Sequence, residues 1–269
     1  KYNLLYQAFG WDIPVYIHCP PVMKDATHKL SKRNGDASFE DLIAKGYLTE
    51  AVVNYIALLG WAPKGENEIF TLEELAQEFD VAGISKSPAI FDTQKLKAIN
   101  GAYIRKLSVD EFLEKALPYI RQTCKREDID LKLLAQMLQP RTELFTDIPD
   151  QVDFIDALPD YDVEMYRHKK MKTNPENSLV SLKELLPALE AVDEADWNLE
   201  KIHEVCFEVI GKLGVKNGVV LWPLRTAISG KQFTPGGGID LAEILGKKET
   251  IARMKDGIAR LEAVVGQEG

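Results

Sequence analysis

The sequence predicts a mainly α-helical protein that begins with a short α/β segment. From residue 38 onward, apolar residues recur at intervals of three and four positions, which is the spacing of one helix face. Several of these stretches begin with Ser, Thr or Asp followed three residues later by Glu, a pair that satisfies the free amides of a first helical turn. Only the N-terminal stretch contains a run typical of a β-strand.

The N-terminal stretch predicts one helix and one strand. Leu4, Leu5 and Phe9 follow a helical spacing that Gly10 ends. Residues 15–19 (Val-Tyr-Ile-His-Cys) lie between prolines and are rich in β-branched and aromatic side chains, so we expect a short strand that extends as far as residue 23. No strand is expected after that.

The helices that follow are predicted from their starts or from their apolar stripes. The capped starts are Thr71 with Glu74, Ser108 with Glu111, Ser181 with Glu184, and Asp240 with Glu243. Pro187 is expected to kink or shorten the helix that follows Ser181. Apolar stripes predict further helices over 49–59, 199–210 and 248–264. Residues 218–222 are interpreted as buried helix or turn rather than strand.

Composition excludes several classes of protein. The net charge is −9, which argues against a protein that coats nucleic acid nonspecifically. The three cysteines (Cys19, Cys124 and Cys206) lie far apart and predict neither a zinc site nor a disulfide framework. The apolar runs are too short to cross a membrane, and no signal peptide is recognisable, so we expect a cytoplasmic protein. Because Lys1 falls within a helical pattern, the chain is expected to begin inside a larger protein.

A basic loop follows the predicted strand. Residues 29–33 (Lys-Leu-Ser-Lys-Arg) place three cations in five positions beside Gly35. Such a loop can fold over a polyphosphate, and cations at the α-phosphate stabilise the charge that develops during adenylyl transfer. An exposed basic turn explains the five residues equally well.

The residues around this loop carry a resemblance to a known family. Ordered blocks occur at 4–11, 46–51, 54–61, 85–92 and 100–105, and again at 223–230 and 245–253. Together with residues 29–33, these blocks resemble glutamyl-tRNA synthetases, which are class I aminoacyl-tRNA synthetases. Between about 108 and 215 the similarity is limited to the helical pattern.

The resemblance implies roles for the basic loop. Lys32 is then the catalytic residue that contacts ATP and stabilises the adenylation transition state, and Lys29, Leu30, Ser31 and Arg33 complete the ATP-binding loop. The substrates are glutamate and ATP, with Mg²⁺ expected beside the ATP. The flanks depart from the family pattern at Thr27, His28 and Asn34. The first class I signature, His-x-Gly-His, is absent, so this chain alone is expected to be inactive.

The resemblance also implies a tRNA site near the other end of the chain. Arg225, Thr234 and Pro235 match positions that contact the anticodon in some members, and Arg141 lies in a loosely matching region that faces it. Arg225 offers a forked donor to base edges or phosphate. From the residues alone, an ion pair explains Arg225 and an ordinary turn explains Thr234 and Pro235. The expected partner is tRNA(Glu), with tRNA(Gln) left open, and a monomer is expected.

Other conspicuous residues have two explanations. Residues 167–172 are the most basic run in the chain and could contact a tRNA backbone, but a solvated surface between domains is at least as good an explanation. Trp61 and Trp222 are expected in the core rather than as stacking platforms, and His203 is expected to be a structural histidine.

The predicted architecture is mainly α, with helical anticodon-binding bundles preceded by a short remnant of the class I catalytic α/β domain. Its parts are the end of the catalytic domain (1–37), a helical stem-contact region (38–107) and two anticodon-binding modules (108–165 and 166–269). The resemblance thus predicts the ATP-loop and tRNA-recognition portion of a glutamate–tRNA ligase. The alternatives are a stand-alone tRNA-binding helical module without catalysis, and an acidic helical scaffold that binds no RNA.

Overall fold

The computed structural model describes residues 2–31 and 38–266. The contacts between residues divide the chain into two compact units, Lys1–Tyr103 and Ile104–Gly269. Both are built mainly from helices, as the sequence predicts.

The first unit combines short helices with one two-stranded sheet. Its elements are α1 (Tyr2–Ala8), β1 (Val22–Met23), α2 (Phe39–Ala44), α3 (Thr49–Gly60), α4 (Leu72–Glu78), the 3₁₀ turn η2 (Val81–Gly83), β2 (Ala89–Ile90) and α5 (Thr93–Lys106), within which the boundary between the units falls. The helices predicted at the N-terminus, over 49–59 and after Thr71 are confirmed.

The predicted strand over 15–19 is wrong. These residues form neither helix nor strand, and the side chain of Val15 is 91% exposed. The sheet instead pairs β1 with β2 in parallel, with Val22 opposite Ala89. The β-branched run at 15–19 has the composition of a strand, but a strand also needs a partner, and none pairs with it in the described part of the chain. The sequence did not predict β2, because two residues are too few to show an alternation.

Buried polar side chains hold the first unit together. The side chain of Asn54 donates to the carbonyl of Glu68 (2.8 Å) and accepts from the amide of Phe70 (2.7 Å) and the hydroxyl of Tyr103 (2.9 Å). Trp61 packs with Phe70 in a small apolar core, which confirms its predicted place in the interior. By contrast, none of the described residues of α1 is buried, so its apolar side chains are exposed within this unit.

The second unit is a bundle of helices joined by short 3₁₀ turns. Its elements are α6 (Val109–Thr123), α7 (Leu131–Leu138), η3 (Gln139–Arg141), η4 (Phe145–Asp147), α8 (Ile148–Val152), η5 (Asp153–Ile155), η6 (Val163–Tyr166), α9 (Pro175–Glu190), η7 (Glu194–Asp196), α10 (Leu199–Leu213), α11 (Asn217–Ser229), α12 (Gly238–Leu245) and α13 (Lys247–Val265). The helices predicted over 199–210 and 248–264 are confirmed, and residues 218–222 are helical.

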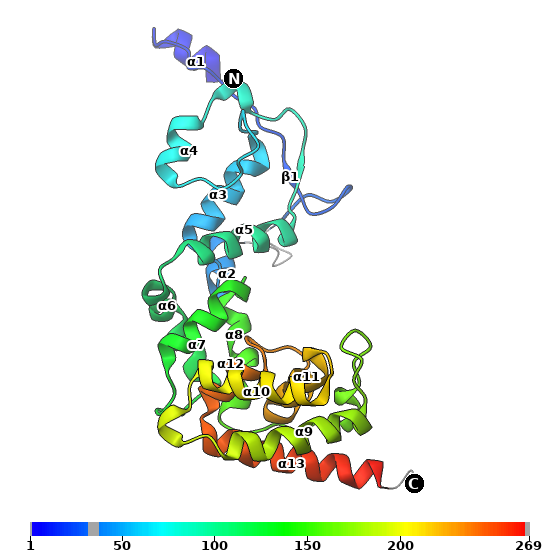
Figure 1. Cartoon of the computed structure of the whole chain (residues 1–269). Coiled ribbons are helices and arrows are strands. Elements are labelled where there is room, and N and C mark those ends of the chain that lie inside the picture. The colour runs from blue at the N-terminus through cyan, green and yellow to red at the C-terminus, as the bar shows by residue number, and fades with distance from the viewer. Residues whose placement is uncertain (1, 32–37, 267–269) are drawn as a thin grey trace. The chain divides into compact units, whose positions relative to one another are not determined.

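Helix α11 is central to the second unit. It packs against α9, α12 and α13, and α9 and α13 run side by side (Figure 1). The apolar stripes meet between these helices, where Leu182, Leu224 and Leu261 are fully buried. Burying each such side chain contributes about 1.5–3 kcal/mol to the free energy of unfolding.

The predicted caps are partly confirmed. The side chains of Thr71 and Ser108 each accept a hydrogen bond from the backbone amide three residues later. In both cases the glutamate at that later position accepts a hydrogen bond from the backbone amide of the capping residue. The predicted start at Ser181 is wrong, because Asn174 caps α9, and Ser181 is buried within the helix and donates to the carbonyl of Val219. The helix also continues past Pro187 to Glu190, so Pro187 does not shorten it at that position.

The start predicted at Asp240 is likewise wrong. Helix α12 begins at Gly238, and Asp240 lies in its first turn, where it accepts from the amide of Gly237 (2.6 Å). An acidic side chain in the first turn satisfies the free amides there. The spacing pattern therefore identified a helix start, but the start lies three positions before the predicted one.

A buried arginine joins several segments of the second unit. Arg253 on α13 is 3% exposed and donates to the carbonyls of Phe154 and Ile228 (2.8 Å each) and of Ile155 (3.1 Å). Its Nε donates to Glu249 at 2.7 Å. Every nitrogen of this guanidinium is therefore hydrogen-bonded within the protein.

Among the described residues, no helix combines the length and the apolar character needed to cross a membrane.

Candidate functional site

Arg225 lies on α11. Contacts within the protein fix its guanidinium, but no described acidic side chain forms an ion pair with it. Its Cζ lies 4.1 Å from the ring of Trp222, and its Nη2 donates to the carbonyl of Gln232 at 2.8 Å. Its Nε has no hydrogen-bond partner among the described residues, and no described carboxylate forms an ion pair with it. The ion pair that was the alternative explanation of Arg225 is therefore not observed. Burial lowers the pKa of Arg225 and the charge of Arg141 lowers it further, although an arginine remains protonated.

A hollow of about 490 Å³ brings two predicted arginines together. Its lining residues are Arg141, Gln151, Arg225, Phe233, Thr234, Gly236 and Gly237. Its polar side chains are the two guanidinium groups, the amide of Gln151 and the hydroxyl of Thr234, and no carboxylate of the described residues lines it. A site of this kind accepts an anion or the acceptor edge of a planar group.

The loop after α11 forms one wall of this hollow. Gly230 ends the helix at a φ of 58°, a left-handed conformation that glycine adopts without strain. The hydroxyl of Thr234 donates to the carbonyl of Gly236 at 2.7 Å and so fixes the turn. Pro235 is buried and does not line the hollow. The structure thus brings Arg141, Arg225 and Thr234 to one site, whereas Pro235 is buried outside it.

Phe233 was missed by the sequence reasoning. Its ring is 80% exposed at the tip of the loop and lines the same hollow as the two arginines. An exposed phenylalanine has a free face on which an unstacked base can lie. The available signal was an aromatic residue in a loop of Pro and Gly, where burial is harder to achieve than in a helix.

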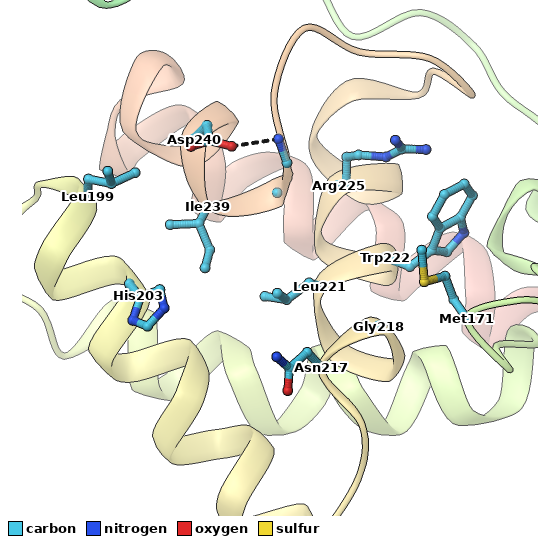
Figure 2. Close-up of a pocket in the computed structure, with 12 residues that line it drawn as sticks. Met171, Leu199, His203, Asn217, Gly218, Leu221, Trp222, Arg225, Ile239 and Asp240 are labelled. Carbon is cyan, nitrogen blue, oxygen red and sulfur yellow. Dashed lines mark hydrogen bonds between the residues drawn. The ribbon is translucent and has the colours of Figure 1, made fainter. Parts of the chain in front are cut away.

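A second, mostly apolar pocket of about 520 Å³ adjoins the first and shares Arg225 and Gly237 with it. Figure 2 shows Leu221 and Ile239 directed into this pocket, with Arg225 and Trp222 next to each other at its edge. Trp222 is only half-buried, and its Nε1 donates to the carbonyl of Met165 at 3.1 Å. The prediction that Trp222 is a core residue rather than a platform is wrong, because its ring supports the guanidinium of Arg225.

His203 also lines the apolar pocket. Its side chain is exposed and stacks on Phe207, with ring centroids 4.0 Å apart. The apolar stripe of α10 faces the core, and His203 lies beside this stripe rather than in it, so the structural role predicted for His203 stays a prediction.

The basic loop near the N-terminus is described in part. Lys29 forms an antiparallel bridge with Met23, and the amide of Leu30 donates to the carbonyl of Val22 at 3.0 Å. The turn before it is fixed by Asp25, whose pKa is held well below its usual range by hydrogen bonds from Thr27 and His28. Ser31 is half-buried. Lys32 and Arg33 lie outside the described residues.

Within 2–31 and 38–266, no group of three or more His, Cys, Asp or Glu side chains is arranged to hold a metal ion. Cys124 and Cys206 are buried and Cys19 is exposed, and all three are free thiols.

Comparison with known families assigns the helical unit. Residues 111–258 match the family described as "Anticodon binding domain", and the chain belongs to that family. Residues 1–98 match a second family, described as "tRNA synthetases class I (E and Q), catalytic domain". The resemblance and the mainly helical fold class predicted from the sequence are thereby confirmed.

Several relatives carry one particular name. The chain is 62% identical over 262 residues to a glutamate–tRNA ligase of Clostridium acetobutylicum, a match that covers 97% of this chain and 54% of the relative. It is 60% identical over 264 residues to a glutamate–tRNA ligase of Clostridium botulinum, covering 98% and 54% respectively. The chain thus spans about half the length of the curated relatives it matches.

Solved structures agree with this assignment. A glutamate tRNA ligase of Elizabethkingia meningosepticum, crystallised in complex with its amino acid, matches with a TM-score of 0.80 and 28% identity, covering 97% of this chain and 54% of that one. A glutamate–tRNA synthetase of Elizabethkingia anophelis matches with a TM-score of 0.79 and 27% identity, covering 96% of this chain and 54% of that one.

Proposed function

We propose that this chain is the tRNA-recognition and ATP-loop portion of a glutamate–tRNA ligase, which activates glutamate with ATP and transfers it to tRNA(Glu). The observation that carries the proposal is the hollow in the second unit. There Arg141 and Arg225 converge without a carboxylate beside the exposed ring of Phe233. These residues belong to a chain of the anticodon-binding domain family.

The chemistry of the hollow suits a single-stranded RNA loop. Proteins read RNA sequence mainly in loops, where bases can leave the stack and expose their edges. The fork of Arg225 is fixed by Trp222 and Gln232, so it loses little freedom when it donates to a base edge. Arg141 adds a second donor, Thr234 and Pro235 shape the loop, and Phe233 supplies a surface for stacking. The partner proposed is tRNA(Glu), and tRNA(Gln) is a further candidate.

A local site also fits the charge of the chain. With a net charge of −9, the protein as a whole repels a polyanion, so affinity has to come from a few placed cations. Arg225 and Arg141 are such cations, because none of the described acidic side chains lines their hollow.

The ATP loop is the second part of the proposal. In the intact enzyme, a carboxylate oxygen of glutamate attacks the α-phosphate of ATP, an O–P bond forms, and pyrophosphate leaves. Lys32 would stabilise the charge that grows on the phosphates, with Lys29, Leu30, Ser31 and Arg33 completing the loop. Mg²⁺ would enter with ATP, held mainly by the phosphates. The match of residues 1–98 to a class I catalytic domain supports this part.

Lys32→Ala tests the ATP loop in the intact enzyme. Removing a charge that acts on the transition state is expected to lower the rate of ATP–pyrophosphate exchange by about 10²–10³, while the affinity for tRNA stays nearly unchanged. Full activity of the variant would contradict the assignment.

The four-part domain division, the monomeric state and the cytoplasmic location belong to the same proposal.

Arg225→Ala tests the tRNA site. We expect the 269-residue chain to prefer a tRNA(Glu) transcript to an unrelated tRNA, and the variant to lose about 1–3 kcal/mol of that preference. Arg260→Ala is the matched control, because Arg260 also lies over an aromatic ring, that of Tyr161, but is paired with Asp160 and Asp256. Equal, weak binding of both tRNAs that neither substitution alters would contradict the proposal and favour the acidic scaffold.

The two experiments together separate an enzyme from a stand-alone tRNA-binding module. If the chain binds tRNA(Glu) selectively but Lys32→Ala has no effect in the intact protein, the stand-alone tRNA-binding module is the better description.

A further inference from the structure

The basic run at 167–172 forms a short, rigid hairpin between η6 and α9. His168 and Thr173 pair as an antiparallel bridge through two backbone hydrogen bonds, of 3.1 and 3.2 Å. Within the turn, the amide of Met171 donates to Nδ1 of His168, and Asn177 donates to the carbonyl of Lys172. These bonds fix the backbone of residues 168–173, which we call the basic hairpin.

The tip of the basic hairpin carries three exposed lysines. No described carboxylate forms an ion pair with Lys169, Lys170 or Lys172, although most exposed ion pairs of this chain involve a lysine. Arg167, at the base of the hairpin, pairs with Glu164 at 2.9 Å. The uncompensated charge is therefore at the tip, in a chain whose overall charge is negative.

The backbone of the hairpin is held in an unfavourable conformation at its tip. Lys172 has a φ of 60°, and it is the only described residue other than glycine with a positive φ. A side chain in this left-handed region costs roughly 1–2 kcal/mol relative to the usual conformation. Glycine would relieve this cost, yet a lysine stands there, as expected if the position serves for its charge.

The basic hairpin packs against the indole of Trp222, on which Arg225 also lies. The ring of His168 lies 4.0 Å from that of Trp222, on which the guanidinium of Arg225 also lies. Met171 contacts α11 at Gly218, where an added Cβ would come within 2.7 Å of its sulfur, and Figure 2 shows Met171 beside Trp222. The hairpin and Arg225 are thus fixed to one helix face.

We propose that the basic hairpin binds the sugar–phosphate backbone of the same RNA whose base Arg225 contacts, and that the His168–Trp222–Arg225 stack sets the spacing between the two contacts. This inference rests on the proposed function. Lysines on a fixed turn suit phosphate, because a compact ammonium needs no particular orientation of the anion. Asp162 and Glu164 line a small hollow at the base of the hairpin together with Arg167, His168 and Trp222, and Glu164 is paired there with Arg167.

The test compares two double variants of the 269-residue chain. Lys169→Gln with Lys170→Gln removes two charges from the tip, and Lys115→Gln with Lys248→Gln removes two exposed charges elsewhere in the second unit. The affinities for transcripts of tRNA(Glu) and of an unrelated tRNA are measured over a series of KCl concentrations. A third arm, Lys172→Gly, removes one charge at a position where glycine keeps the backbone conformation.

We expect the hairpin variant to lose about tenfold in affinity for both tRNAs, and the slope of log K against log salt to become shallower by about 1.5, as for two lost phosphate contacts. The ratio of the two affinities should not change, and Lys172→Gly should show a smaller loss of the same kind. An affinity and a slope equal to those of the Lys115 and Lys248 control would overturn the inference.

The outcomes also separate this inference from the proposed function. If the hairpin variant loses affinity but Arg225→Ala leaves the preference for tRNA(Glu) intact, the hairpin stands as a phosphate contact and the anticodon proposal fails. If Arg225→Ala abolishes the preference and the hairpin variant behaves as the control, only the hairpin inference fails. A wild-type chain that binds neither transcript contradicts both.

Discussion

Two arginines of the second unit are placed in opposite ways. The nitrogens of Arg253 all donate to atoms of the protein, three of its bonds going to buried carbonyls of η5 and of α11. Arg225 donates to one carbonyl, lies over an indole and keeps its Nε without a partner among the described residues. A buried arginine whose donors are all used serves the fold, whereas one with unused donors beside a hollow is available to a ligand.

Stability should distinguish the two arginines most strongly. Arg253→Ala is expected to lower the free energy of unfolding by about 3–5 kcal/mol, because three buried carbonyls lose their donor. Arg225→Ala should cost only about 1 kcal/mol, the sum of one hydrogen bond and one cation–π contact. Urea unfolding of the second unit measures both. Similar losses for the two variants would remove the distinction between a structural and a functional arginine.

Substitution of Phe233 should weaken tRNA binding more than it lowers stability. Because its ring is 80% exposed, Phe233→Ala is expected to change the free energy of unfolding by less than about 0.5 kcal/mol. If a base stacks on the ring, affinity for tRNA(Glu) should fall by about 1–3 kcal/mol. Phe207, which stacks on His203 away from the hollow, provides the control substitution. Unaltered affinity of Phe233→Ala would exclude stacking at this position.

Two buried thiols report on the packing of the second unit. Burial raises the pKa of Cys206 to about 12 and that of Cys124 to about 11, while an unfolded thiol titrates near 9.0. The unfolded chain therefore releases these protons first, so stability present below pH 9 should decrease as the pH rises from about 9 towards 12.

Urea unfolding at a series of pH values between 8 and 12 measures this decrease, and thiol labelling at pH 8 checks the burial of the two thiols. Only Cys19 should react rapidly in the native chain, and Arg253→Ala should speed the labelling of the buried pair, whereas Arg225→Ala should not. Rapid labelling of Cys206 in the unaltered chain would show that the unit is less tightly packed than described.

The features predicted correctly from the sequence are mostly local ones. The caps at Thr71 and Ser108 depend on residues three positions apart, and the helix over 199–210 depends on its own apolar stripe. Ser181 shows the limit of such patterns, because its spacing to Glu184 fits a cap although the helix begins about two turns earlier, at Asn174 and Pro175. The strand at 15–19 failed because pairing depends on distant residues.

The candidate site could also be predicted only in part from the sequence. The resemblance placed Arg225, Arg141 and Thr234 at one site, and they line one hollow in the structure. What no local pattern contains is whether an acid of the same chain reaches Arg225, or whether Phe233 turns outward. Both depend on how α11 and the loop after it pack against the rest of the unit.

In the proposed function, the unused donors of Arg225 contact a base of the anticodon. A double-mutant cycle tests it directly: tRNA(Glu) and transcripts with single anticodon substitutions are bound to the unaltered chain and to Arg225→Ala. For one anticodon position we predict a coupling energy of at least about 1 kcal/mol, so that the variant no longer distinguishes the two bases there. Losses that add within about 0.5 kcal/mol at every anticodon position would contradict the claim.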